Sequence, residues 1–304
     1  MSTEHKSALL NSQVKFFQPG LKGAPRRLLV LIKFELYKLF NYWVIRGGYI
    51  AMLGIALIAS VLAYEVEKAA KLASGSGYAF AIGILLRCVD VSAPILFLMM
   101  CVIFSIEMTY GTIKNILTRP VSRLEMIISK YITAWIMILI ALAIFLAVGL
   151  PMGAHYYGLG DLTEDGYLLF RRSVMFKELA IAIAFLMIPY ITLSSLALMM
   201  SSFSSTMGGA MILGLIGYFF FELFGIIPNN IGIKVGKHFL PLSSFGFPTQ
   251  RLVPLYILDD LPAGIPIQSW WVWDIQKMVI ICGIYFVIFF TITILVIKRR
   301  DFTV

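Results

Sequence analysis

The sequence predicts an all-α membrane protein with six transmembrane helices. Of its 304 residues, 60% are hydrophobic and 13% are charged, whereas roughly 25% of the residues in soluble domains are charged. Six apolar stretches are long enough to cross about 30 Å of hydrocarbon, which takes about 20 helical residues. Lys and Arg residues concentrate on one side of these stretches. Composition, stretch length and charge placement therefore agree on one polytopic membrane domain.

The first 41 residues contain no apolar stretch of that length. Residues 1–24 are polar and are expected to form a flexible cytoplasmic lead. They show no signal-peptide pattern, so the first span is expected to direct insertion. Residues 25–41 predict an amphipathic helix, because Pro25 suits a first helical turn and the apolar residues recur with helical spacing. The apolar stripe consists of Leu28, Ile32, Leu36, Leu39 and Phe40.

This amphipathic helix is expected to lie in the membrane interface. Three of its basic residues, Arg26, Lys33 and Lys38, fall opposite the apolar stripe. The charged residues that define the interfacial helix are Arg26, Arg27, Lys33, Glu35 and Lys38.

Residues 42–304 are expected to form the transmembrane domain. The predicted spans are residues 43–64, 91–110, 131–153, 179–203, 206–227 and 275–297. The fourth and fifth spans are separated only by a Ser- and Gly-rich turn over residues 201–209. Six spans place both termini on one side, where we count 15 Lys and Arg residues against nine on the other. The positive-inside rule then predicts a multi-pass inner-membrane protein with both termini in the cytoplasm.

Residues 228–274 form a long segment between the fifth and sixth spans. It contains six prolines and ends in a tryptophan cluster over residues 270–273. Tryptophan is enriched where the membrane meets water. The segment is too apolar for a free linker, so we expect it to be partly re-entrant, with short helices that dip back to the membrane.

The loop between the second and third spans has a helical pattern of its own. Ile113, Ile116 and Leu117 share one face, and a second apolar set follows the break expected at Pro120. That second set is Val121, Leu124, Ile127 and Ile128. Two short helices at an angle would give a soluble partner a rigid lever. An ordinary interfacial loop whose basic residues meet anionic lipid would show the same pattern.

This loop resembles that of the ABC-2 family of permeases. Members carry a Glu at the end of the second span, then Gly-Thr, a basic residue and Leu-x-Arg-Pro-x-Ser-Arg. This chain has Glu107, Gly111-Thr112, Lys114 and the run from Leu117 to Arg123. The Glu35-Leu36-Tyr37-Lys38 core of the amphipathic helix and the order of the elements are also similar. By this resemblance the ATPase-coupling residues are Glu107, Gly111, Thr112, Lys114, Leu117, Arg119, Pro120, Ser122 and Arg123.

The resemblance implies a non-catalytic permease subunit of an ATP-driven exporter. It further implies a second copy of this chain, or a related permease, and two ABC ATP-binding subunits that carry the ATP and Mg²⁺. The sequence agrees that this chain binds no cofactor. Its nearest match to a phosphate-binding loop, Gly232 to His238, has the wrong spacing. The other expected partner is membrane lipid, and no nucleic acid is expected because the basic residues flank the spans.

A few polar and small residues within or near the spans are further candidates. Glu222 lies near the outer end of the fifth span, where it would serve the substrate pathway or dimer seam, or hydrogen-bond under the outer segment. Gly214 and Gly217 form a small-residue surface expected to meet a second protomer. Arg87 and Asp90 lie three residues apart and are expected to pair.

Three other function classes are compatible with parts of the sequence. A secondary transporter normally needs several intramembrane carboxylates and repeated halves, and only Glu222 qualifies. A hydrolase would draw on His238 with Ser243 or Ser244 and Asp259, a trio that no motif holds together. A subunit that performs ATP-driven mechanical work on another membrane protein stays open. The three cysteines lack the spacing of a metal site, and no residue pattern identifies the substrate.

Overall fold

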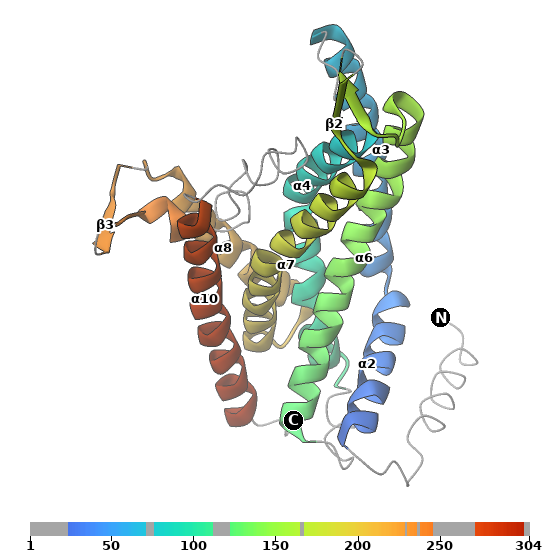
Figure 1. The fold of residues 1–304 in the computed structure, drawn as a ribbon. Coiled ribbons are helices and arrows are strands. Elements are labelled where there is room, and N and C mark those ends of the chain that lie inside the picture. Colours follow the sequence, from blue (N-terminus) through green and yellow to red (C-terminus); the bar gives the residue numbers. More distant parts are fainter. Residues whose placement is uncertain are drawn as a thin grey trace, which may run out of the picture.

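The protein is a bundle of long helices with two small β-hairpins beyond the helix ends (Figure 1). The computed structural model describes residues 24–70, 76–111, 122–164, 167–228, 230–235, 238–245 and 271–300. Within these ranges, six helices are long and apolar enough to cross a membrane. The prediction of a six-span α-helical membrane domain is therefore confirmed.

The helices and strands follow one another along the chain in a fixed order. They are α2 (Ala24–Phe40), α3 (Trp43–Ala70), α4 (Gly77–Thr109), α6 (Arg123–Tyr157), β1 (Leu162–Glu164), β2 (Tyr167–Phe170), α7 (Arg172–Phe203), α8 (Met207–Ile226), β3 (Gly232–Val235), β4 (His238–Pro241), a 3₁₀ turn (Leu242–Phe245) and α10 (Trp271–Arg299). The turn between α7 and α8 falls at Ser204–Thr206, inside the predicted Ser- and Gly-rich turn.

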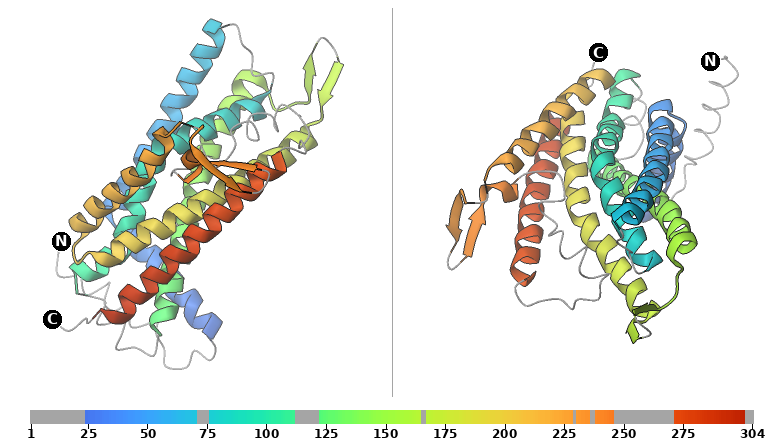
Figure 2. Two further views of the ribbon diagram at one scale, coloured as in Figure 1. Left: turned by 90° about the vertical axis from the view of Figure 1, so that its left-hand side faces the viewer. Right: turned by 90° about the horizontal axis from the view of Figure 1, so that it is seen from above.

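Helix α4 is the centre of the bundle. It packs against α3, α6, α7 and α8, and most of its membrane-spanning portion is buried. Seen from above, it lies between α3 on one side and α7 and α8 on the other (Figure 2). Helices α3, α8 and α10 lie at the periphery and expose apolar side chains along their lengths. Such faces suit lipid or another membrane helix, because neither provides hydrogen bonds.

Several helices are longer than the hydropathy predicted. α4 begins at Gly77 instead of residue 91, and the 35 residues of α6 span about 52 Å at 1.5 Å per residue. Hydropathy detects only the portion that crosses about 30 Å of hydrocarbon. The added turns are fixed by packing, as where the Gly77 amide donates to the Gly158 carbonyl at 3.0 Å.

Helix α6 corrects part of the loop prediction. Ile127 and Ile128 belong to α6, which runs unbroken from Arg123, so they are not part of a separate short helix. Ser122 and Glu125 fix this start as a capping box, in which each side chain accepts from the backbone amide of the other. The first predicted helix, around Ile113 to Leu117, lies outside the described residues.

The two hairpins are antiparallel pairs that the sequence patterns did not predict. β1 pairs with β2 between α6 and α7, and β3 pairs with β4 after α8. The described part of the segment after α8 is thus a hairpin and a 3₁₀ turn, not a helix that dips toward the membrane. Residues 246–270 of that segment lie outside the described ranges. Helix α10 begins at Trp271, within the predicted tryptophan cluster.

The starts of α2 and α6 and the end of α10 lie at the same end of the bundle (Figure 1). The contact between Arg123, the first residue of α6, and the Ile297 carbonyl of α10 confirms this placement. Both ends of the described chain therefore lie at one end of the molecule, as an even number of spans requires.

Candidate functional site

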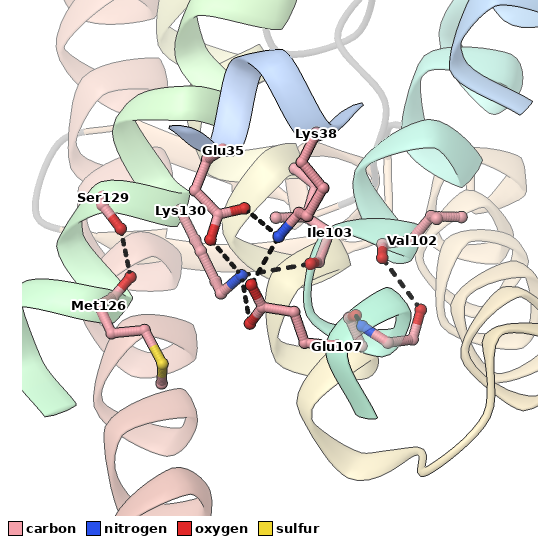
Figure 3. Close-up of polar contacts among 10 residues, drawn as sticks. Glu35, Lys38, Val102, Ile103, Glu107, Met126, Ser129 and Lys130 are labelled. Atoms are coloured by element: carbon pink, nitrogen blue, oxygen red, sulfur yellow. Dashed lines mark hydrogen bonds and ion pairs between the residues drawn. The ribbon is translucent and has the colours of Figure 1, made fainter. Parts of the chain in front are cut away.

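Four charged side chains from three helices meet at the C-terminal end of α4 (Figure 3). Glu35 and Lys38 come from α2, Glu107 from α4 and Lys130 from α6. The Lys38 ammonium lies 2.6 Å from one Glu107 oxygen, and the Lys130 ammonium lies 2.8 Å from the other. Lys130 also donates to Glu35 at 2.9 Å, and Lys38 pairs with Glu35. We call these four residues the charge cluster.

The charge cluster is almost completely removed from the surface. The side chains of Lys130, Glu107 and Glu35 are 0%, 1% and 2% exposed. A buried charge costs several kcal/mol unless an opposite charge and hydrogen bonds compensate it. Two carboxylates and two ammonium groups in alternation give a net charge of zero, so each ion is compensated by its neighbours.

The position of the charge cluster also suits the dipole of α4. The last turn of α4 contains no basic residue of its own, although the C-terminal end of a helix favours positive charge. Lys38 and Lys130 supply that charge from neighbouring helices, and Lys130 also donates to the Ile103 carbonyl at 3.4 Å. Glu107 can therefore remain ionised at an end of a helix that would otherwise repel it.

Lys38 is held in its charged form. Burial alone would lower its pKa, but the charges of Glu107 and Glu35 and their hydrogen bonds outweigh burial and raise the pKa above its ordinary value. Lys38 is thus a permanent cation at neutral pH.

The charge cluster changes the predicted orientation of α2. The most buried residues of α2 are Leu31, Ile32, Glu35 and Leu39, whereas Phe40 of the predicted stripe is 37% exposed. Lys38 turns toward the bundle instead of lying with Arg26 and Lys33, which are exposed. The apolar pattern could not show this rotation, because the partners of the two buried charges lie 69 and 95 residues away.

A second ion pair holds the other end of α2. Arg27 lies 3.4 Å from Glu125 at the start of α6, and Glu125 is held in turn by the capping box with Ser122. The helix is therefore attached to α6 near both of its ends. This attachment is compatible with an interfacial location, since Arg26, Leu29 and Lys33 still face outward.

The chain turns sharply where it leaves α4 and enters the loop. Gly111 has a φ of 63°, a left-handed conformation that favours glycine and commonly ends helices. Thr109 Oγ1 accepts from the Met207 amide at 3.0 Å, which ties the end of α4 to the start of α8. Thr112, Lys114, Leu117, Arg119 and Pro120 lie outside the described residues, so their predicted coupling role stays a prediction.

Comparison with protein families matches residues 31–217 to the ABC-2 family transporter proteins. The match covers more than half of the chain, from α2 through the loop and into α8. The chain belongs to the ABC-2 transporter family. Comparison with curated proteins gives no match. The family assignment makes the chain a membrane permease component of an ABC transporter, and it explains why the loop motif stands where it does.

Two of the predicted coupling residues are engaged inside the permease. Glu107 is enclosed by two lysines and is therefore a buried support for the loop. Arg123 donates from Nη1 to the Ile297 and Lys298 carbonyls of α10, at 3.1 and 2.8 Å. Lys130, which the sequence showed only as one of several basic residues at the start of a span, completes the cluster. The sequence feature that could have identified Lys130 is a charged residue inside the apolar helical pattern that begins at Leu124.

The glycine surface of α8 faces other helices of the same permease. A side chain at Gly214 would meet Cys101 of α4, and one at Gly217 would meet Met200 of α7. The predicted small-residue seam is thus occupied within one chain. The opposite face of α8 exposes Ile212, Ile216, Phe219, Phe220 and Leu223.

Glu222 has neighbours that the sequence pattern did not predict. Tyr218 hydrogen-bonds to Glu222, and the charge of Glu222 acts on Asp90 of α4. No ion pair joins Arg87 to Asp90 among the described residues, so that predicted pair was wrong. The described residues also contain no group of three or more His, Cys, Asp or Glu side chains that could hold a metal ion.

Proposed function

We propose that this permease couples ATP hydrolysis by two separate ABC ATP-binding subunits to the export of a substrate. The ATP and Mg²⁺ reside on those subunits, and this chain supplies the membrane pathway. The subunits dock on the loop after Glu107, which faces the cytoplasm together with both termini, and the assembly lies in the inner membrane. The observation that carries the proposal is the charge cluster at the stem of that loop, in a chain of the ABC-2 family.

The charge cluster gives a docked subunit a firm connection to the membrane helices. A displacement of the loop acts first on the end of α4, where Glu107 is ion-paired to α2 and α6. Helix pairs joined by buried charges resist sliding, because separating the charges would leave them unpaired in a dry environment. The three helices therefore move as one body when the loop is pushed.

The proposed transporter contains two permease chains. The faces of α8, α3 and α10 expose apolar side chains that a second permease could cover, whereas Gly214 and Gly217 are already covered. We propose the exposed face of α8 as the seam. Glu222 lies on the same helix, half-buried, beside this face.

A charge-reversal experiment tests the docking site. The tagged full-length chain is purified in mild detergent together with its ATP-binding subunit, and the recovered amounts are compared. Lys114→Glu with Arg119→Glu is expected to lower the recovered ATP-binding subunit at least about tenfold, because like charges across an interface cost several kcal/mol. Arg123 is left intact, since it is needed for α10.

The matched control is Arg171→Glu with Arg172→Glu. These two arginines are exposed at the other end of the bundle, so the same change in net charge should leave the complex intact. Equal recovery from the loop variant and the wild type would contradict docking at the loop.

A further inference from the structure

Arg123, at the start of α6, caps the C-terminal end of α10. The last four carbonyls of a helix have no partner within it, and Arg123 supplies donors to two of them on α10, those of Ile297 and Lys298. A guanidinium carries several donors in a rigid plane, so it holds two carbonyls in fixed geometry. Arg123 follows the cytoplasmic loop directly and is therefore the point where loop and α10 meet.

Arg300 repeats this arrangement one helix further on. It lies just after α10 and donates from Nη1 to the carbonyls of Ser202 and Ser204, at 2.6 and 3.3 Å, at the end of α7. The last turn of α7 contains no basic residue of its own, so Arg300 provides both the donors and the positive charge that this helix end favours.

Few other contacts join α6 to α10. Among the described residues, the other connections are largely aromatic: Tyr131 touches Phe286 and Phe290 and shares a hydrogen bond with Thr293, and Trp135 touches Phe286. Helix α10 packs mainly on α7. The charge cluster reaches α2, α4 and α6 but not α10, so the end of α10 depends on Arg123 for its polar link to the loop.

We propose that Arg123 and Arg300 are positioning residues that form an arginine relay from the loop to the last span. When the loop moves, Arg123 carries the end of α10 with it, and Arg300 then carries the end of α7. The relay rests on the proposed function, since it needs an ATP-driven displacement of the loop. It gives Arg123 of the family motif a role inside the permease in place of direct contact with the ATP-binding subunit.

Pulsed EPR distances in the full complex test the relay. Each sample has a reference spin label at Leu57 of α3 and a second label at Ile284 of α10 or Phe176 of α7, all of which are exposed; the three buried cysteines are replaced by alanine. Distances are measured with and without ATP plus vanadate. The wild type is expected to shift both second labels relative to α3.

The variants break the relay at successive points. Arg123→Gln should keep the ATP-binding subunits and the resting distances but reduce the ATP-dependent shifts of α10 and α7 at least about threefold. Arg300→Gln should preserve the α10 shift and reduce that of α7. The control, Arg299→Gln, removes an exposed charge from the same helix end and should preserve both shifts.

Three outcomes would overturn the relay. Full shifts in Arg123→Gln would show that α10 follows another connection. Loss of the ATP-binding subunits from Arg123→Gln would make Arg123 a docking residue. An absence of any ATP-dependent shift in the wild type would instead refute the proposed function itself, and the relay with it. If Arg123→Gln does not fold, Arg123→Lys, which keeps the charge with fewer donors, should show reduced shifts, and the Arg300→Gln result stands independently.

Discussion

At the scale of single residues, the charge cluster explains why four ions are tolerated beside membrane-spanning helices. Each charge has at least one opposite charge within 3 Å, and the sum is zero. Buried ion pairs contribute little to net stability because desolvation offsets their attraction, but removing one partner leaves the other unpaired. The residues of the charge cluster should therefore behave as a unit in mutational tests.

The unit can be measured with a double-mutant cycle. Glu107→Gln leaves two buried lysines facing one carboxylate and should destabilise the protein by about 3–5 kcal/mol, as should Lys130→Met. The double variant restores neutrality and should lose clearly less than the sum of the two. Thermal unfolding in detergent provides the readout, with Glu65→Gln at an exposed position as the control. Additive losses would show that the two residues act independently.

Lys38 makes a prediction about pH. Its folded pKa is raised above its ordinary value of 10.5, so its charge stabilises the fold fully below pH 10.5 and this contribution is lost as the pH rises through the folded pKa. The difference in unfolding temperature between wild type and Lys38→Met should therefore be constant from about pH 7 to 10 and shrink only above that range.

The control for this titration is Lys68→Met, at an exposed lysine, which should show little difference from wild type at any pH. If the Lys38→Met difference instead closed between about pH 7 and 9, burial would outweigh the two carboxylates and the assigned direction of the pKa shift would be wrong.

At the scale of elements, helix contacts at glycine decide how α8 sits on the bundle. A Cβ at Gly214 would lie 2.4 Å from Cys101 Sγ of α4, which no real contact allows. α4 and α8 therefore pack tightly where Gly214 meets Cys101, a pairing of small side chains that is common in membrane bundles.

The contact between residues 214 and 101 predicts that a second substitution can restore the stability that a first one removes. Gly214→Ala should lower the unfolding temperature, whereas Gly214→Ala with Cys101→Ala should recover most of the loss. Removing the sulfur leaves Cε1 of the Phe97 ring at 3.2 Å and the Cys101 Cβ at 3.6 Å, which a shift of a few tenths of an ångström accommodates. The matched control is Gly283→Ala on α10, where no atom lies within 4 Å. Failure of Cys101→Ala to restore stability would contradict the close α4–α8 packing.

The sequence predicted the elements better than their contacts. Hydropathy located all six spans, because placing polar groups in lipid is costly and spans must therefore be apolar. The Ser- and Gly-rich composition of residues 201–209 located the turn between α7 and α8. It could not show that Glu35 and Lys38 turn inward, since their partners come from distant segments. The short hairpins were missed because three- and four-residue strands leave almost no periodic pattern.

The candidate site was predicted in its location but not in its construction. The motif from Glu107 to Arg123 marked the loop, yet Glu107 and Arg123 are engaged within the permease. Lys130 was missed as a site residue, although a charge inside an apolar helix is a recognised signal. The capping box of Ser122 and Glu125 was also readable, as Ser-x-x-Glu before an apolar run.

At the scale of the whole molecule, a set of polar connections between distant helices gathers at the end of the bundle from which the loop after α4 leaves. The charge cluster joins α2, α4 and α6; Thr109 joins α4 to α8; and Arg123 and Arg300 join α6, α10 and α7. The loop after α4 leaves the bundle at the centre of these connections. A force applied there reaches α4, α6, α7, α8 and α10 through polar contacts, which suits a permease that is moved by separate ATP-binding subunits.

The most direct test of this account is photo-crosslinking from the loop in native membranes. A photoreactive amino acid replaces Leu117 or Arg119 in the full-length chain, and the crosslinked partners are identified by mass spectrometry. The account predicts a partner that contains the phosphate-binding sequence Gly-x-x-x-x-Gly-Lys-Ser/Thr of ATP-binding subunits, and none from the same probe at Arg172. Crosslinks from the loop only to lipid, or to a protein without that sequence, would contradict it.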